Sequence, residues 1–179
     1  MFLALCTETI GWYMREKLKI YDNALPFNIL MVISSLFFIW FLSTAKEMVS
    51  VRKWLFGLNS LFAVFSITNL VFFQGLSRYN SFSESLADII IALICCYFLF
   101  TLVQSNTHMS LLRFDYFWIA NGLLFYCLGS AMLYQFSYLL MDYDRLTHID
   151  IGTFINYALN IILYTSLIIG FICKRQATR

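Results

Sequence analysis

Residues 86–103 have the sequence LADIIIALICCYFLFTLV, a run of 18 residues in which Asp88 is the only charged side chain. A helix rises about 1.5 Å per residue, so a run of this length nearly crosses the roughly 30 Å hydrocarbon core of a bilayer. Four further runs with charge-free interiors occur on either side of it, at residues 27–45, 54–73, 116–141 and 151–173. We therefore predict an all-α, polytopic transmembrane helix bundle with five full spans.

The chain outside these spans is short. The longest connection between them, residues 14–26, has 13 residues, whereas an independent domain needs at least about 40 to 50. Residues 1–13 are also apolar but extend only about 20 Å as a helix, which predicts a partial helix whose first part lies upstream. Residues 1–179 thus form a single transmembrane domain, and any binding or chemistry must occur inside the bundle or at its rims.

The composition supports a lipid environment. Apolar residues make up 61% of the chain and charged residues 12%, whereas soluble domains have about 45 to 50% and about 25%. A chain with so few charged residues has too little polar surface to cover a globular protein in water. The high hydrophobicity, the few cysteines and the net charge of +2 argue against disorder, a disulfide-rich secreted domain and a nucleic-acid partner. The expected partner is the lipid bilayer.

The basic residues predict the orientation. Taking alternate connections, seven Lys and Arg residues fall on the side of the C-terminus and five on the other. Short cytoplasmic loops retain positive charge, so this bias predicts a cytoplasmic C-terminus, as does the Lys174-Arg175 pair after the last span. With an upstream first helix, the intact bundle would have seven spans, an outer N-terminus and an inner C-terminus.

Two carboxylates are candidates for a ligand or coupling site. A carboxylate within a span costs about 2.5 to 3.5 kcal/mol, so it needs a partner, a water-filled cavity or a proton. Glu8 fits a proton-titrating or ligand-pairing group, or a carboxyl bonded to an Asn of a neighbouring span. Asp88 could guard a pore mouth or bind a cation with Asp142, Asp144 and Asp150, or these loop aspartates are simply solvated. Glu84, one turn earlier, is favoured by the dipole at the helix start. Ser81 or Ser83 could cap that helix.

Amides and glycines form the second set of candidates. Asn156 and Asn160 follow Gly152 at intervals of four residues and predict a polar stripe on the last span, and Asn121 lies in the fourth. Such amides either form hydrogen bonds between helices, worth about 0.6 kcal/mol each, or line a polar cavity. Gly122 and Gly129 are seven residues apart and predict close helix packing, as does Gly152.

No catalytic pattern is present in the sequence. HExxH, GxSxG, Walker and CxxC motifs are absent, and the five cysteines form no ligand set. His108 and His148 fall on opposite sides of the predicted bilayer and cannot share a metal. We therefore expect a non-enzymatic protein with no metal and no cofactor.

Three stretches carry a resemblance to a family: ETIGWY at residues 8–13, YFWI at 116–119 leading into GLLFY at 122–126, and the ending from Asn160 to GFICK at 170–174. They resemble a loosely defined group of uncharacterised multi-span bacterial membrane proteins, which are similar to seven-span membrane input modules of bacterial sensors. The resemblance implies a bacterial inner-membrane location and one more span at the N-terminus. It implies no catalytic residue and no ligand.

We therefore expect a sensor or signalling module that works with a separate cytoplasmic protein partner. The competing hypotheses are a small transporter or the subunit of an oligomeric channel, and a structural or assembly subunit of a larger complex. The absence of proline inside the spans argues against the broken helices found in many carriers.

Overall fold

The structure is a computed structural model that describes residues 24–73, 80–104, 114–136 and 151–177, together with positions 7, 9, 10, 13, 16, 139, 140 and 143. In the continuous ranges it contains five long helices, a short 3₁₀ helix and a π-helical turn, and no strand. Their bounds are α2 Ala24–Ser43, η1 Lys46–Met48, α3 Arg52–Thr68, η2 Asn69–Phe73, α4 Ser81–Gln104, α5 Asp115–Gln135 and α7 Ile151–Ala177. The predicted helical bundle is confirmed.

Five segments are long and apolar enough to cross a membrane: Ala24–Ser43, Arg52–Phe73, Ser81–Gln104, Asp115–Leu133 and Ile151–Cys173. Each overlaps one predicted span, but the ends differ. Helix α4 begins five residues before residue 86, because Glu84 in its first turn favours a helix N-terminus. Helix α5 ends at Gln135 instead of residue 141. Of the predicted partial helix at 1–13, the structure describes only Thr7, Thr9, Ile10 and Tyr13, all helical.

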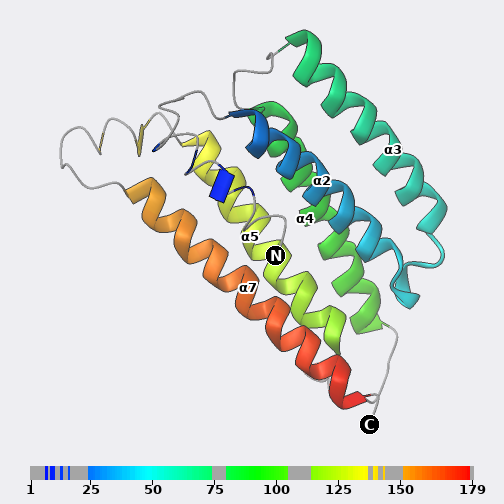
Figure 1. The fold of residues 1–179 in the computed structure, drawn as a ribbon. Helices are drawn as coiled ribbons and strands as arrows, with labels where there is room; N and C mark the ends of the chain where they lie inside the picture. The colour runs from blue at the N-terminus through cyan, green and yellow to red at the C-terminus, as the bar shows by residue number, and fades with distance from the viewer. Residues whose placement is uncertain are drawn as a thin grey trace.

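The five helices alternate in direction (Figure 1). Helix α4 packs against α5 on one side and α2 on the other, while α3 is attached mainly through α2 and α7 through α5. Accordingly, 44% of the apolar stretch of α4 is buried inside the structure, whereas only 17% of that of α7 is buried. The turn between α2 and α3 lies at the same end of the bundle as the end of α7.

Arg52 holds the turn between α2 and α3 together. Its Nε donates to the carbonyl oxygen of Ser43 at 2.9 Å, and its Nη2 donates to those of Thr44 at 3.3 Å and Ala45 at 3.4 Å. The last carbonyls of a helix have no partner within the helix and carry partial negative charge. The guanidinium fork therefore satisfies the end of α2 with a side chain from the first turn of α3.

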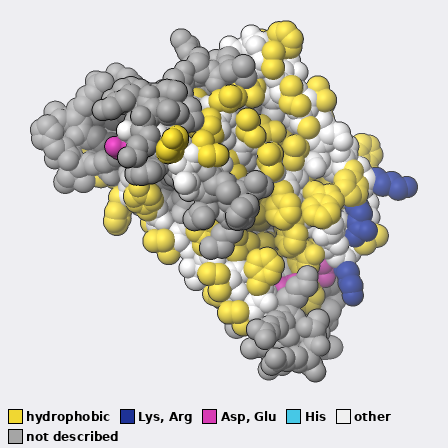
Figure 2. All heavy atoms as spheres, viewed as in Figure 1, with side chains coloured by type: hydrophobic (Ala, Val, Ile, Leu, Met, Phe, Trp, Pro, Cys, Tyr) yellow, Lys and Arg dark blue, Asp and Glu magenta, His cyan; other side chains and the backbone are white. Residues whose placement is uncertain are grey.

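The outer surface of the bundle is apolar, as Figure 2 shows for one face. Trp54 is 81% exposed, Phe73 80% and Phe154 74%, whereas Asn28, Asn80 and Ser83 are fully buried. This distribution is the reverse of that in a soluble protein, where large aromatic side chains are covered and amides face water. Together with the five apolar helices, it suggests an integral membrane protein.

Candidate functional site

Asp88 is a buried carboxyl near the start of the central helix α4. It lies in the second turn of α4 and is 6% exposed. Ser130 on α5 donates a hydrogen bond from its Oγ to Oδ2 of Asp88, across the contact between the two helices. Because both side chains are buried and come from different helices, the bond ties the packing of α4 and α5 to the state of one carboxyl group.

Two other polar groups lie next to this pair. Glu84 lies one turn before Asp88 on α4, and the Ser130 hydroxyl also lies 3.2 Å from the carbonyl oxygen of Cys127 in its own helix. Asp88, Ser130 and Glu84 thus form a small polar region where α4 meets α5.

A second polar cluster lies near the start of α4 and consists of Asn28, Asn69, Asn80 and Ser83. Asn69 Nδ2 donates to Asn80 Oδ1 at 2.6 Å and to Ser83 Oγ at 3.0 Å. The backbone N–H of Asn80 donates to Asn28 Oδ1 at 2.8 Å. We call these four residues the asparagine cluster; it joins α2, η2 and the beginning of α4.

The local backbone explains why the cluster forms there. Asn80 immediately precedes α4, and its carbonyl oxygen accepts the N–H of Glu84 at 3.1 Å, so its side chain is held at the helix start. Asn69 begins the π-helical turn η2, a local deviation that is common at functional sites. Asn80 Nδ2 and Ser66 Oγ are buried and have no hydrogen-bond partner in the part of the chain that the structure describes. Ser66 lies three residues before Asn69, on the same side of the helix.

The other predicted amides are not part of either cluster. Asn121 donates to the carbonyl oxygen of Phe117 in its own helix at 2.8 Å. Asn160 donates to the backbone oxygen of Asn156 at 2.9 Å and to its Oδ1 at 3.2 Å, again within one helix, and Asn156 is exposed. Gly152 is half-buried. Glu8 lies outside the described residues. The structure therefore does not place Asn121, Asn156 or Asn160 beside Asp88.

The glycines of α5 lie against α7. A Cβ atom on Gly122 would overlap the side chain of Ser166, and one on Gly129 would overlap that of Leu159. Gly170 on α7, which the sequence argument did not single out, lies similarly against Ile119, with a Cβ 2.8 Å from its Cγ1. These three positions let α5 and α7 approach closely.

Asn28, Asn80, Ser130 and the bridging role of Ser83 were not predicted from the sequence. Asn28 and Asn80 are 52 residues apart, and serine is common in membrane helices, so no local pattern marks them. Ser83 was a candidate cap, but it lies inside α4 and its hydroxyl accepts a bond from Asn69. The one sequence feature that could have indicated the asparagine cluster is the spacing of Ser66 and Asn69, which places two polar side chains on the same side of an apolar helix.

Among the described residues, no group of three or more His, Cys, Asp or Glu side chains could hold a metal ion. No protein-family model, curated protein or solved structure matches the chain. A function for the chain must therefore be inferred from its own contacts.

Proposed function

We propose that the chain is a non-enzymatic integral membrane protein that acts as a sensor or signalling module for a separate cytoplasmic partner. The observation that carries the proposal is the buried bond between Ser130 and Asp88. An ionisable side chain in a membrane-spanning helix is costly and usually functional. Here it links the central helix α4 to α5, so an input that alters the carboxyl would alter the packing of these two helices.

In this proposal, the end of the bundle that carries the turn between α2 and α3 passes the signal to the partner. Tyr116 at the start of α5 stacks on Phe41 of α2, with ring centroids 5.1 Å apart, and contacts the Thr44 hydroxyl at 3.3 Å. It also lies 6.2 Å from the ring of Phe98 on α4. A change in how α4 meets α5 would thus reach this end through packed side chains. We propose that this end faces the cytoplasm of a bacterial inner membrane, because it carries Lys46, Arg52 and Lys53.

The test removes the hydrogen bond between Ser130 and Asp88 and measures how much of the cytoplasmic partner protein is bound. Asp88→Asn and Ser130→Ala are compared with Ser35→Ala, a control that removes a largely buried hydroxyl bonded only to its own helix, at 2.8 Å from the Met31 oxygen. The full chain is purified from its native membranes in mild detergent, and co-purified proteins are quantified. We expect the amount of one cytoplasmic protein to change several-fold in the first two variants and to stay the same in the third. Recovery of the chain alone in every case contradicts the signalling role.

The same buried carboxyl supports transport as a second candidate function. A carboxylate within a bundle is a common proton or cation relay in carriers. Ion flux measured in proteoliposomes separates the two functions. Flux that is abolished by Asp88→Asn but retained in Ser35→Ala would establish transport instead of signalling.

A further inference from the structure

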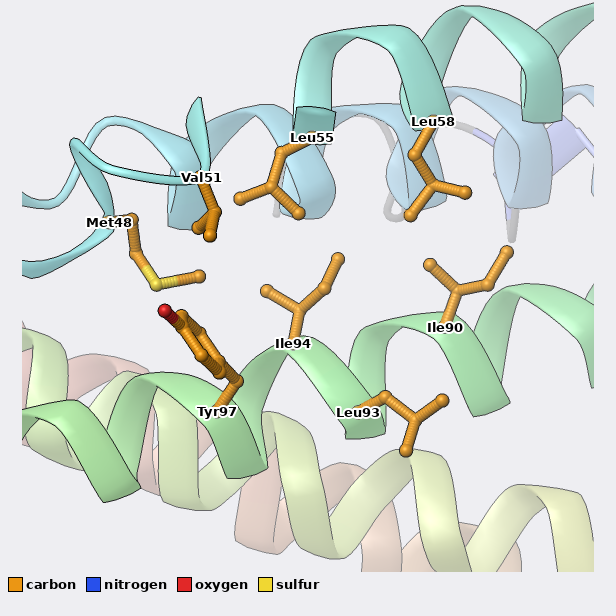
Figure 3. A pocket seen from close by; sticks show the side chains of 8 residues that line it. All are labelled: Met48, Val51, Leu55, Leu58, Ile90, Leu93, Ile94 and Tyr97. Carbon is orange, nitrogen blue, oxygen red and sulfur yellow. The ribbon is translucent and has the colours of Figure 1, made fainter. Parts of the chain in front are cut away.

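An apolar groove separates α3 from α4. It is lined by Val51, Leu55 and Leu58 on one side and by Ile90, Leu93, Ile94 and Tyr97 on the other, with Met48 at one end, and its volume is about 350 Å³ (Figure 3). The groove is open because α3 is attached through α2 and contacts α4 only slightly. Its volume is at the lower end of the range for small-molecule sites, about 300 to 1,000 Å³. In a membrane protein this groove would open toward lipid.

One end of the groove is basic. Met48 and Val51 belong to the turn that also carries Lys46, Glu47, Arg52 and Lys53, so that three cations accompany one carboxylate. Arg52 is engaged at the end of α2, whereas the side chains of Lys46 and Lys53 are exposed and make no hydrogen bond or ion pair with a described residue. Figure 2 shows the described Lys and Arg side chains together at one edge of the molecule. The Tyr97 hydroxyl lies at the same end, beside Met48.

We infer that the groove binds an anionic phospholipid, with one acyl chain between α3 and α4 and the phosphate near Lys46 and Lys53. The occupant must be amphipathic, because the groove is apolar along its length and, among the described residues, its cations lie at one end. Long lysine side chains reach from a helix end to the headgroup region, which makes phosphate the natural counter-ion there. The inference rests on the membrane location proposed above but not on the signalling role.

A second copy of the chain fits the groove less well. A symmetric dimer with its two-fold axis along the membrane normal would bring the same basic turn of both copies to the same level. Each turn carries three cations and one carboxylate, so two turns of like net charge would lie at the same level. An anionic lipid removes this repulsion.

Native mass spectrometry of the detergent-purified full chain tests the site. The protein is titrated with phosphatidylglycerol or with phosphatidylcholine of the same acyl chains, and the bound fraction is measured. In the double variant Lys46→Gln with Lys53→Gln, we expect a roughly 30-fold loss of affinity for phosphatidylglycerol, since each basic residue near an anionic headgroup contributes about fivefold. Lys174→Gln with Arg175→Gln is the matched control, because it removes the same charge at the end of α7.

A second pair of variants tests the acyl chain. Leu58→Trp fills the groove and should reduce binding of both lipids, whereas Leu128→Trp adds the same volume on α5, where Leu128 is 48% exposed, and should change neither. Equal affinity of the unmodified protein for both lipids overturns the inference, as does a dimer cross-linked through α3 and α4. A chain that stays dissolved without detergent overturns the membrane location itself.

Discussion

At the scale of single residues, Asn69 is the side-chain donor of two hydrogen bonds in the asparagine cluster. Its one amide nitrogen donates to both Asn80 and Ser83, and through the N–H of Asn80 the cluster extends to Asn28. Asn69 is 6% exposed and Asn80 fully buried, so water cannot replace these bonds if they are lost. A single side chain therefore fixes the end of α3 against the beginning of α4.

We predict that Asn69→Ala lowers the free energy of unfolding by about 1 to 2 kcal/mol, because it removes two buried bonds and leaves the Asn80 oxygen without a donor. For a chain of this size the melting temperature should fall by roughly 2 to 8 °C. The measurement is thermal unfolding in detergent.

Asn121→Ala is the control for this prediction. Asn121 is half-buried and donates only to the Phe117 oxygen of its own helix, so its loss should cost clearly less. Equal melting temperatures for the two variants would show that the asparagine cluster contributes nothing specific.

At the scale of helices, the contact between α5 and α7 depends on residues without a side chain. Gly122, Gly129 and Gly170 each lie where a Cβ atom would be too close to the neighbouring helix. Gly57 on α3 differs, because nothing lies within 4 Å of the position its Cβ would occupy. Gly122 and Gly129 can therefore be used to test the close packing of α5 and α7, with Gly57 as the control.

Gly122→Ala and Gly129→Ala should each destabilise the protein by about 1 to 3 kcal/mol, because α5 and α7 must move apart or their side chains must leave their preferred rotamers. Gly57→Ala should stabilise it by about 0.5 to 1 kcal/mol, because alanine favours a helix more than glycine does. Melting temperatures of the three variants check both signs. A gain of stability at Gly122 would contradict the close packing.

The length of the apolar runs was enough to predict the helices, but not the contacts between them. Helix α5 is apolar on every side, so its sequence does not indicate that Ser130 faces Asp88 and that Asn121 bonds within its own helix. The asparagine cluster combines segments that lie far apart in the sequence, and Arg52 reaches back nine residues to the Ser43 oxygen. Such contacts are set by tertiary packing, which periodicity does not describe.

At the scale of the whole molecule, different segments of the chain lie at the two ends of the bundle. The turn between α2 and α3 and the end of α7 lie together at one end (Figure 1), and the start of α7 lies at the other. If the chain spans a membrane, these positions must be accessible from opposite sides of it.

We predict that cysteines introduced at Ser50 and Ala177 react with an impermeant maleimide from the same side, and one at Thr153 from the other, in a background without the native cysteines. Sealed vesicles of known orientation provide the measurement. Reaction at Ser50 and Ala177 from the cytoplasmic side supports the proposed orientation, and reaction from the outer side reverses it. Labelling of all three from one side would rule out the transmembrane arrangement.

The link from Arg52 back to the end of α2 also has a consequence for biogenesis. Its donors and acceptors all lie between Ser43 and Arg52, so this hairpin can close as soon as α3 has been synthesised. The hydrogen bonds from Asn69 to Asn80 and Ser83, and from Asn80 to Asn28, can form only after Asn80 and Ser83 have been synthesised. The hairpin of α2 and α3 can therefore form before the asparagine cluster ties it to α4.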